Sequence, residues 1–178
     1  MKLNQCNLCD LSKDRNNVVT PLATSKRPLV LFLGDAPTTL EESKNKPFYN
    51  AGRDTPGYWH NEVVTQLGYE NNHLAMNMIQ CVPKSRPTGE QINSCYTWLE
   101  KLFQVYVFKL VILYGEIPIR RMLGVSGSVK PFLGRFYLIE ELGIKCFATL
   151  HPSSLINSDA YVKTMAKHIK LMRRFLKE

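Results

Sequence analysis

The chain has 178 residues, and its 23 Lys and Arg against 15 Asp and Glu give a formal net charge of +8. Its hydrophobic fraction of 44% is too high for a disordered protein, and no apolar run approaches the roughly 20 residues that cross a bilayer. The N-terminus lacks the apolar segment of a secretion signal. We therefore expect a single domain over residues 1–178 of a cytoplasmic monomer with no membrane partner. The positive charge favours a polyanionic partner such as nucleic acid.

Strand-like and helical patterns alternate along the chain. Four near-continuous apolar runs are typical of strands buried on both faces: Leu29–Leu33, Leu74–Ile79, Leu110–Tyr114 and Lys145–Leu150. Apolar residues at helical spacing predict helices at Tyr58–Leu67, Thr88–Tyr106, Ile117–Leu123 and Ala160–Lys177. The last helix, within residues 160–177, is amphipathic and carries a basic stripe. Because strands alternate with helices, the sequence predicts an α/β domain with a parallel sheet.

The segments between these elements add two expectations. Arg135–Glu140 and Ile144–Leu150 are expected to form an antiparallel hairpin at one edge of the sheet. The longest loop is expected at Ser43–Pro56, and a long loop in a compact domain is often functional. Glu41 and Glu42, just before it, are expected to form the solvated acidic start of a helix.

Polar residues stand at the carboxyl ends of the predicted strands. Asp35 follows the first strand, Asn77 lies within the second run, and His151 follows the fourth. Ligands of open α/β sheets bind outside the carboxyl ends of the strands, so we expect these side chains to line one cleft. Asn77 needs a partner there, because an unpaired amide in an apolar strand is costly. Asp35 has a second, compatible role as a cap for the helix after its own turn.

Four of the five cysteines form a pattern that core packing alone does not explain. They are Cys6, Cys9, Cys81 and Cys95. The first two lie in a polar N-terminal segment, residues 1–27, which four thiolates would anchor through a metal site. The wide spacing of the second pair favours an iron–sulfur cluster over zinc, which is the alternative. Cys146 lies among apolar residues and is expected to be a packing residue.

Several segments of the chain resemble, in order, motifs of the uracil-DNA glycosylase superfamily, most closely its iron–sulfur family 4. The segments are Cys6-x2-Cys9-x-Leu11, Leu33–Pro37 with Glu41, Lys46–Gly52, Met76–Cys81 with Arg86–Thr88 and Cys95, and Leu150–Ser153 with Leu155. The resemblance covers nearly the whole chain. It implies a three-layer α/β/α fold with a central four-stranded parallel sheet, and a [4Fe–4S] cluster on the four cysteines.

The resemblance also implies roles for residues at the strand ends. Asp35 would position or activate water at C1′ of the sugar. His151 would lie against O2 of the base and stabilise the negative charge that develops there. Four residues would bind the extruded base, Phe48 by stacking and Asn77 at the Watson–Crick edge: Phe48, Asn77, Ala36 and Pro37. Leu155 would push into the duplex, and Ser153 and Ser154 would contact DNA beside it.

The activity implied is that of a monofunctional DNA glycosylase, which flips a base out of DNA and hydrolyses its N-glycosidic bond to leave an abasic site. Asp35 stands where family 4 usually has Glu, and further differences cluster around the base pocket. Because pocket changes alter which base is accepted, the expected substrate is uracil or a modified pyrimidine. The alternative is a non-catalytic DNA-binding module of the same fold, such as a replication accessory protein.

Overall fold

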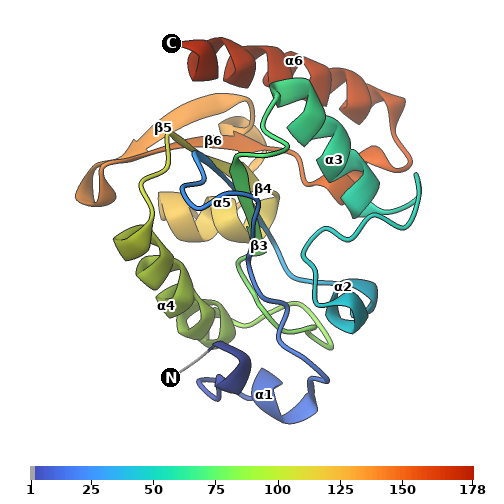
Figure 1. Cartoon of the computed structure of the whole chain (residues 1–178), viewed down its shortest axis with the longest axis vertical. Coiled ribbons are helices and arrows are strands. Elements are labelled where there is room, and N and C mark those ends of the chain that lie inside the picture. Colours follow the sequence, from blue (N-terminus) through green and yellow to red (C-terminus); the bar gives the residue numbers. More distant parts are fainter. Residues whose placement is uncertain (1–2) are drawn as a thin grey trace.

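The computed structural model describes residues 3–178, in which one six-stranded sheet carries helices on both faces (Figure 1). The strands are β1 (Leu22–Ala23), β2 (Val30–Gly34), β3 (His73–Asn77), β4 (Leu110–Tyr114), β5 (Arg135–Ile139) and β6 (Ile144–Thr149). Their order across the sheet is β1-β3-β2-β4-β6-β5. β3, β2, β4 and β6 are parallel, whereas β1 and β5 pair antiparallel at the two edges. The predicted α/β fold with a parallel centre is confirmed, and two edge strands complete the sheet.

The helices of residues 3–178 are α1 (Leu11–Asp14), α2 (Thr39–Lys44), α3 (Pro56–Leu67), α4 (Gly89–Val105), α5 (Glu116–Leu123) and α6 (Asp159–Lys177). Helices α3 and α6 cover one face of the sheet, and α4 and α5 cover the other. Short 3-10 turns occur at Leu3–Gln5, Lys130–Phe132, Glu140–Leu142 and Pro152–Leu155. The predicted helices are confirmed with ends shifted by at most two residues, and Thr88 and Gln91 form the capping box that starts α4.

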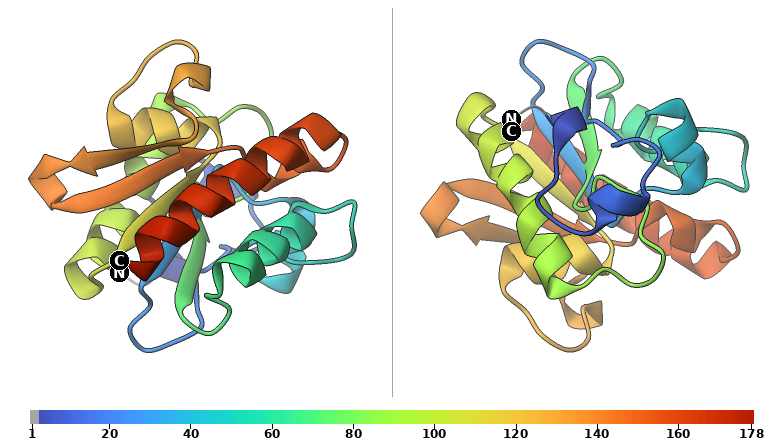
Figure 2. Two further views of the ribbon diagram at one scale, coloured as in Figure 1. Left: turned by 90° about the horizontal axis from the view of Figure 1, so that it is seen from above. Right: turned by 90° about the horizontal axis from the view of Figure 1, so that it is seen from below.

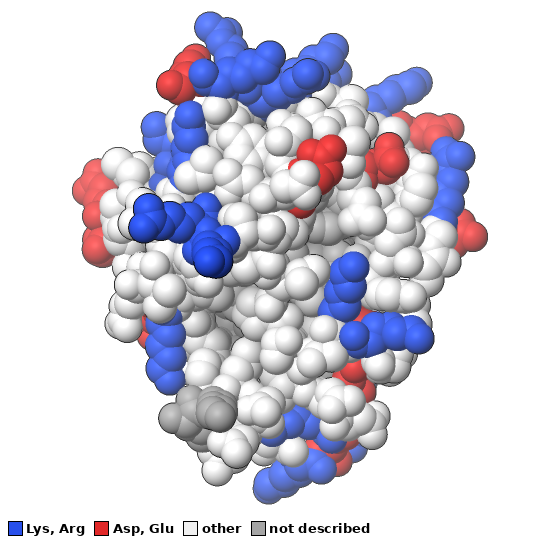
Figure 3. Space-filling view, viewed as in Figure 1, with Lys and Arg blue, Asp and Glu red and all other residues white. Residues whose placement is uncertain are grey.

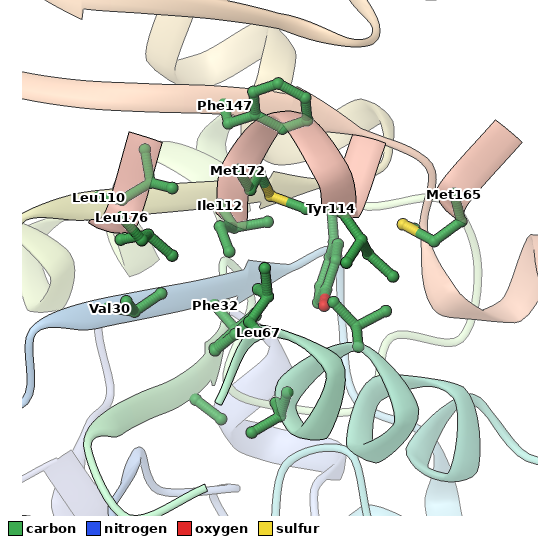
Figure 4. Close-up of a cluster of buried hydrophobic side chains, with 14 of the residues drawn as sticks. Val30, Phe32, Leu67, Leu110, Ile112, Tyr114, Phe147, Met165, Met172 and Leu176 are labelled. Atoms are coloured by element: carbon green, nitrogen blue, oxygen red, sulfur yellow. The ribbon is translucent and has the colours of Figure 1, made fainter. Parts of the chain in front are cut away.

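Alternate side chains of the central strands point to opposite helix layers. Val30 and Phe32 of β2 belong to a core shared with α3 and α6, and Figure 4 shows part of this core. Leu31 and Leu33 belong to the core on the other face, which includes Leu99 of α4. Figure 2 shows α6 crossing one face of the sheet. Both faces are covered, which explains why the residues of β2, β3 and β4 are all buried.

A third, smaller core lies outside these layers, beneath the N-terminal segment. It contains Leu11, Val18 and Ile79 together with Cys81 and Cys95. The segment lies beside the start of α4, as the right-hand view of Figure 2 shows. Hydrogen bonds join the segment to this helix: the Gln91 amide donates to Asp10 (2.8 Å), and the Ser94 hydroxyl donates to the Leu8 carbonyl (3.2 Å).

Three sequence expectations differ from the structure. β3 ends at Asn77 rather than at Ile79, although Ile79 is fully buried. The loop predicted over Ser43–Pro56 is shorter, because α2 extends to Lys44 and α3 begins at Pro56. The two-residue strand β1 was not predicted, since so short a segment shows no alternation. By contrast, the antiparallel hairpin of β5 and β6 is confirmed.

The surface is unevenly charged. Lys and Arg side chains gather along α6 at the top of the view in Figure 3, and the centre of that face carries few charges. The exposed basic residues of α6 lie opposite its buried stripe of Met165, Ile169 and Met172. Within residues 3–178, no helix combines the length and apolar character that a membrane span requires.

Candidate active site at the carboxyl edge of the sheet

The ends of β2 and β3 bring Asp35 and Asn77 together. Gly34 and Asn77 are partners in the parallel register of these strands. Beyond them, the Met78 N–H donates to the Gly34 carbonyl (2.7 Å) and the Ile79 N–H donates to the Asp35 carbonyl (3.0 Å). The chain after β3 is thereby bound to the end of β2, which holds Asp35 and Asn77 at one edge of the sheet.

Two glycines make room for the side chains at this edge. A Cβ atom at Gly34 would collide with Oδ1 of Asn77 and lie 2.6 Å from Cζ of Phe48. A Cβ atom at Gly115, where β4 ends, would lie 2.6 Å from Oδ2 of Asp35. Gly115 also has φ of 85°, which favours glycine. Asp35, Phe48 and Asn77 therefore meet at positions that only glycine leaves open. Together with His151 they are called the strand-end site below.

Asp35 is held by the start of α5. Its Oδ1 accepts a hydrogen bond from the Ile117 N–H (2.8 Å), so it caps the helix after β4 and not, as predicted, the helix after its own turn. Burial raises the pKa of Asp35 to about 6. Backbone N–H groups and the charge of Arg86 oppose that rise, and the charge of Glu116 adds to it. Asp35 is therefore a carboxylate at neutral pH and gains a proton in mildly acidic solution.

Glu41 is the partner that the buried Asn77 requires. Its Oε1 accepts from the Phe48 N–H (2.6 Å) and from Nδ2 of Asn77 (3.3 Å), and its Oε2 accepts from the N–H and hydroxyl of Thr38. The expectation that Glu41 and Glu42 are solvated is wrong, because they are only 6% and 4% exposed. The pattern Thr38-x-x-Glu41 predicts the capping box with Thr38, but it does not predict that Glu41 is buried. Glu41 thus orients both the loop of Phe48 and the amide of Asn77.

Phe48 lies between the strand ends and α3. Its backbone has φ of 51°, unusual for a residue with a side chain, and the hydrogen bond to Glu41 helps to hold it there. Its ring stacks on His60 of α3, with centroids 4.4 Å apart and planes 22° apart. The ring is 3% exposed. His60 was not predicted to take part in the site, and it forms the support of one face of Phe48.

His151 presents one nitrogen to the site. Its Nδ1 accepts from the Ser153 N–H (3.2 Å), which can only donate, so the proton of the neutral ring is on Nε2. Burial lowers the pKa of His151 to about 4, so the ring is neutral at pH 7. Nε2 is buried and has no hydrogen-bond partner within residues 3–178. The centroid of the His151 ring lies 6.2 Å from that of the Phe48 ring, so this N–H is an available hydrogen-bond donor close to Phe48.

Two more buried polar atoms without a described partner lie around Phe48. They are Nδ1 of His60 and the hydroxyl of Tyr114, whose ring centroids lie 4.4 and 5.8 Å from that of Phe48. Burial lowers the pKa of His60 and raises the pKa of Tyr114, so both are neutral. An unmet buried polar group costs about 1–3 kcal/mol. The surroundings of Phe48 are therefore more polar than its aromatic neighbours suggest.

The other predicted site residues are divided between the site and the cores. Ala36 packs against the core of the N-terminal segment, and Pro37 is buried. Ser153 is exposed, whereas Ser154 is half-buried. Leu155 is 2% exposed and packs in the core of α3 and α6, so it would have to leave that core to act as a wedge in the duplex, and this role stays a prediction. Leu155 ends the 3-10 turn Pro152–Leu155, which contacts both α3 and α6.

The four cysteines outside the sheet gather around the third core. The charges of Cys6 and Cys9 both contribute to raising the pKa of Cys81, and those of all three raise the pKa of Cys95, which burial carries to about 12. Within residues 3–178, no three His, Cys, Asp or Glu side chains are arranged to hold a metal ion. The metal site therefore stays a prediction. Cys146 is fully buried in a sheet core, as predicted.

Each of these four sulfurs receives a hydrogen-bond donor. The indole N–H of Trp98 points to Cys6 (3.3 Å) and the guanidinium of Arg15 to Cys81 (3.7 Å). Backbone N–H groups of Leu11 and Gln80 lower the pKa of Cys9 and Cys95. Donors to sulfur are what a thiolate ligand needs in its surroundings, so the donor set fits a bound cluster or metal.

Comparisons with known proteins point to one family. The family model of the uracil DNA glycosylase superfamily matches residues 22–176. A type-4 uracil-DNA glycosylase of Archaeoglobus fulgidus is 24% identical over 160 residues, which cover 85% of this chain and 78% of the relative. One of Sulfurisphaera tokodaii is 23% identical over 177 residues, covering 94% and 79%. A type-5 uracil-DNA glycosylase of Pyrobaculum aerophilum is 27% identical over 95 residues, covering 52% and 42%.

Proposed function

The chain belongs to the uracil DNA glycosylase superfamily, and on that premise we propose that it is a monofunctional DNA glycosylase that releases uracil or a modified pyrimidine from DNA. The observation that carries the proposal is the strand-end site. There a carboxylate, Asp35, and a buried imidazole N–H without a partner, on His151, flank an aromatic ring and an oriented amide. These are the groups that hydrolysis of an N-glycosidic bond requires.

Base binding uses Phe48 and Asn77. The extruded base stacks on Phe48, whose backbone and opposite face are held by Glu41 and His60. Asn77 reads the Watson–Crick edge, since Glu41 occupies one side of its amide and leaves the remaining donor and acceptor positions for the base. Both residues are fixed before the base arrives, so little ordering is needed on binding.

Bond cleavage uses Asp35 and His151. The bond from C1′ to the base breaks, and its electron pair moves onto the base, where the Nε2–H of His151 donates to O2. A water molecule beside Asp35 forms the new bond to C1′, and its proton passes to the Asp35 carboxylate. A pKa of about 4 keeps the His151 ring neutral at pH 7, and the Nε2–H of a neutral imidazole donates a hydrogen bond to the base without transferring its proton.

We further propose that Cys6, Cys9, Cys81 and Cys95 hold a [4Fe–4S] cluster, with zinc as the alternative. The support is the set of N–H donors directed at the four sulfurs and the resemblance of the cysteine pattern to the iron–sulfur family 4. Such a group supplies a cross-link between the N-terminal segment and α4. DNA is the proposed partner of the basic surface, through contacts with its phosphates.

The test is incubation of the purified chain with oligonucleotides that carry uracil or a modified pyrimidine, followed by cleavage of abasic sites with alkali. We expect strand cleavage with at least one substrate, and a loss of at least about 100-fold in single-turnover rate for Asp35→Asn and for His151→Ala. Binding without cleavage of any substrate would instead establish the DNA-binding module. Full activity of both variants would show that the chemistry lies elsewhere.

A further inference from the structure

A groove of about 230 Å³ lies between the start of α4 and α5. Its lining combines three arginines with apolar side chains: Arg86, Arg120, Arg121, Pro87, Ile92 and Ile117. We propose that this groove binds a backbone phosphate of the DNA strand next to the extruded nucleotide, with Arg121 as the principal contact. The proposal rests on the proposed function only in its choice of DNA as the ligand.

The groove has more positive charge than its own carboxylate neutralises. Glu116 accepts from Arg86 (2.8 Å) and from Nε of Arg120 (2.7 Å), so one carboxylate faces two guanidinium groups. Arg121 forms no ion pair within residues 3–178. Its guanidinium lies over the ring of Tyr96, 3.5 Å from the centroid, and its Nε–H is buried without an acceptor. An anion with several oxygens would meet both needs.

The groove adjoins the strand-end site through Asp35. Ile117 lines the groove, and its N–H donates to the Asp35 carboxylate. The charges of Glu116 and Arg86 are both felt at Asp35, whose pKa the first raises and the second lowers. A nucleotide held at Asp35 would therefore lie next to the lining of the groove. This position distinguishes the arginines here from those scattered elsewhere on the surface.

The chemistry of the lining selects a nucleic-acid strand. A free phosphate would need only the arginines, whereas the groove also presents the apolar side chains of Pro87, Ile92 and Ile117. A DNA strand offers a phosphate and an apolar sugar face at each nucleotide, so it matches both parts of the lining. Contacts of this kind carry no sequence information, and their role is to fix the register of the strand.

The test measures equilibrium binding to single-stranded and duplex oligonucleotides without any target base, as a function of salt. We expect Arg121→Ala and Arg86→Ala to weaken binding several-fold and to lower the slope of log affinity against log salt by roughly one. Arg121→Lys should retain the slope, because the charge remains. Glu116→Gln should strengthen binding, because two arginines lose their competing partner. The matched control is Arg27→Ala, an exposed arginine before β2 at the opposite edge of the sheet.

Each outcome decides the proposal. Equal losses for Arg121→Ala and Arg27→Ala would overturn it, since net charge alone would then explain binding. If Arg121→Ala does not fold, Arg86→Ala gives the same test, because that side chain is 70% exposed. If the groove variants bind DNA as well as the unchanged protein and base release is observed, phosphate binding in the groove is rejected and the proposed glycosylase function is kept. If binding depends on the groove but no base is released, the groove is kept as a binding site and the glycosylase function is rejected.

Discussion

The strand-end site and the N-terminal cysteine segment are held in place by different means, although one short helix touches both. At the strand ends, side chains are fixed by hydrogen bonds inside the sheet edge, as Glu41 fixes Phe48 and Asn77. The cysteine segment has only short 3-10 and α-helical turns and a small core. Its donors point to sulfur atoms. Hydrogen bonds between elements of the sheet edge hold the strand-end site, whereas the contacts of the cysteine segment converge on its sulfur atoms.

Helix α2 connects the two regions through consecutive carboxylates. Glu41 faces the strand ends, and Glu42 accepts from the N–H groups of Asn16 and Asn17 and from the side-chain amide of Asn16. Both carboxylates are buried and both accept backbone N–H groups, but they hold different parts of the chain. Substitutions of this pair therefore perturb one region without the other.

The largest effect is expected from removing one of the four thiols of the predicted metal site. Cys95→Ser should remove most of the bound iron and its absorbance at about 400 nm, because a hydroxyl is a much weaker ligand for iron than a thiolate. Cys146→Ser is the matched control, since Cys146 is equally buried but lies in a sheet core. Iron analysis and the absorption spectrum measure both. A colourless protein that contains zinc, or a Cys95→Ser variant that keeps its iron, would contradict the cluster.

The next effect is expected from Glu41→Ala at the strand ends. The substitution leaves the Phe48 N–H and the Asn77 amide without an acceptor, which should lower the free energy of unfolding by about 2–4 kcal/mol. Base release should fall as well, because Phe48 and Asn77 lose their orientation. Denaturant titration and single-turnover rates measure the two effects. An unchanged rate in the folded variant would show that the two side chains are oriented by packing alone.

The fold was predictable from the sequence because its signals are local and repeated. Continuous apolar runs mark strands covered on both faces, and the parallel centre of the sheet is confirmed. The residues at the strand ends could be selected because polar side chains are rare beside such strands. The ends of the strands were predicted less accurately, because the chain beyond Asn77 leaves the sheet but stays buried and apolar.

The contacts within the site could not be read in the same way. A carboxylate such as Glu41 has the same sequence signature whether it is solvated or buried, and only the approach of the Phe48 loop decides between them. Likewise, Leu155 fits both a wedge and a core position, and packing by α3 and α6 places it in the core. Such contacts join residues far apart in the chain, which periodicity does not report.

A smaller effect is expected from Glu42→Gln, the counterpart of the Glu41 variant. The amide keeps one acceptor oxygen in place of two, so the hydrogen bonds to Asn16 and Asn17 should weaken by about 1–2 kcal/mol in total. Hydrogen exchange of these two backbone amides should become faster, while base release stays near that of the unchanged protein. Equal losses of activity in the Glu41 and Glu42 variants would contradict the conclusion that only Glu41 orients the strand-end site.

The smallest effect concerns the acid limit of activity, the pH below which base release declines. Because the raised pKa of Asp35 is about 6, base release should fall as the pH drops through 6, while His151, with its pKa of about 4, stays neutral. The raised pKa of Asp35 also means that the folded state binds this proton more tightly than the unfolded chain does. Asp35 therefore stabilises the folded state most at low pH, and this contribution to the free energy of unfolding declines as the pH rises to about 6.

A substitution of Glu116 is expected to change this acid limit. Its charge raises the pKa of Asp35, so Glu116→Gln should move the acid limit to lower pH by a fraction of one unit. The pH dependence of the single-turnover rate at saturating DNA measures the shift, and saturation keeps it apart from any change in binding at the groove. Arg27→Ala, far from the site, should leave the limit unchanged. A limit that does not move in Glu116→Gln would mean that the group titrating near pH 6 is not Asp35, and the assignment of the catalytic carboxylate would have to be made again.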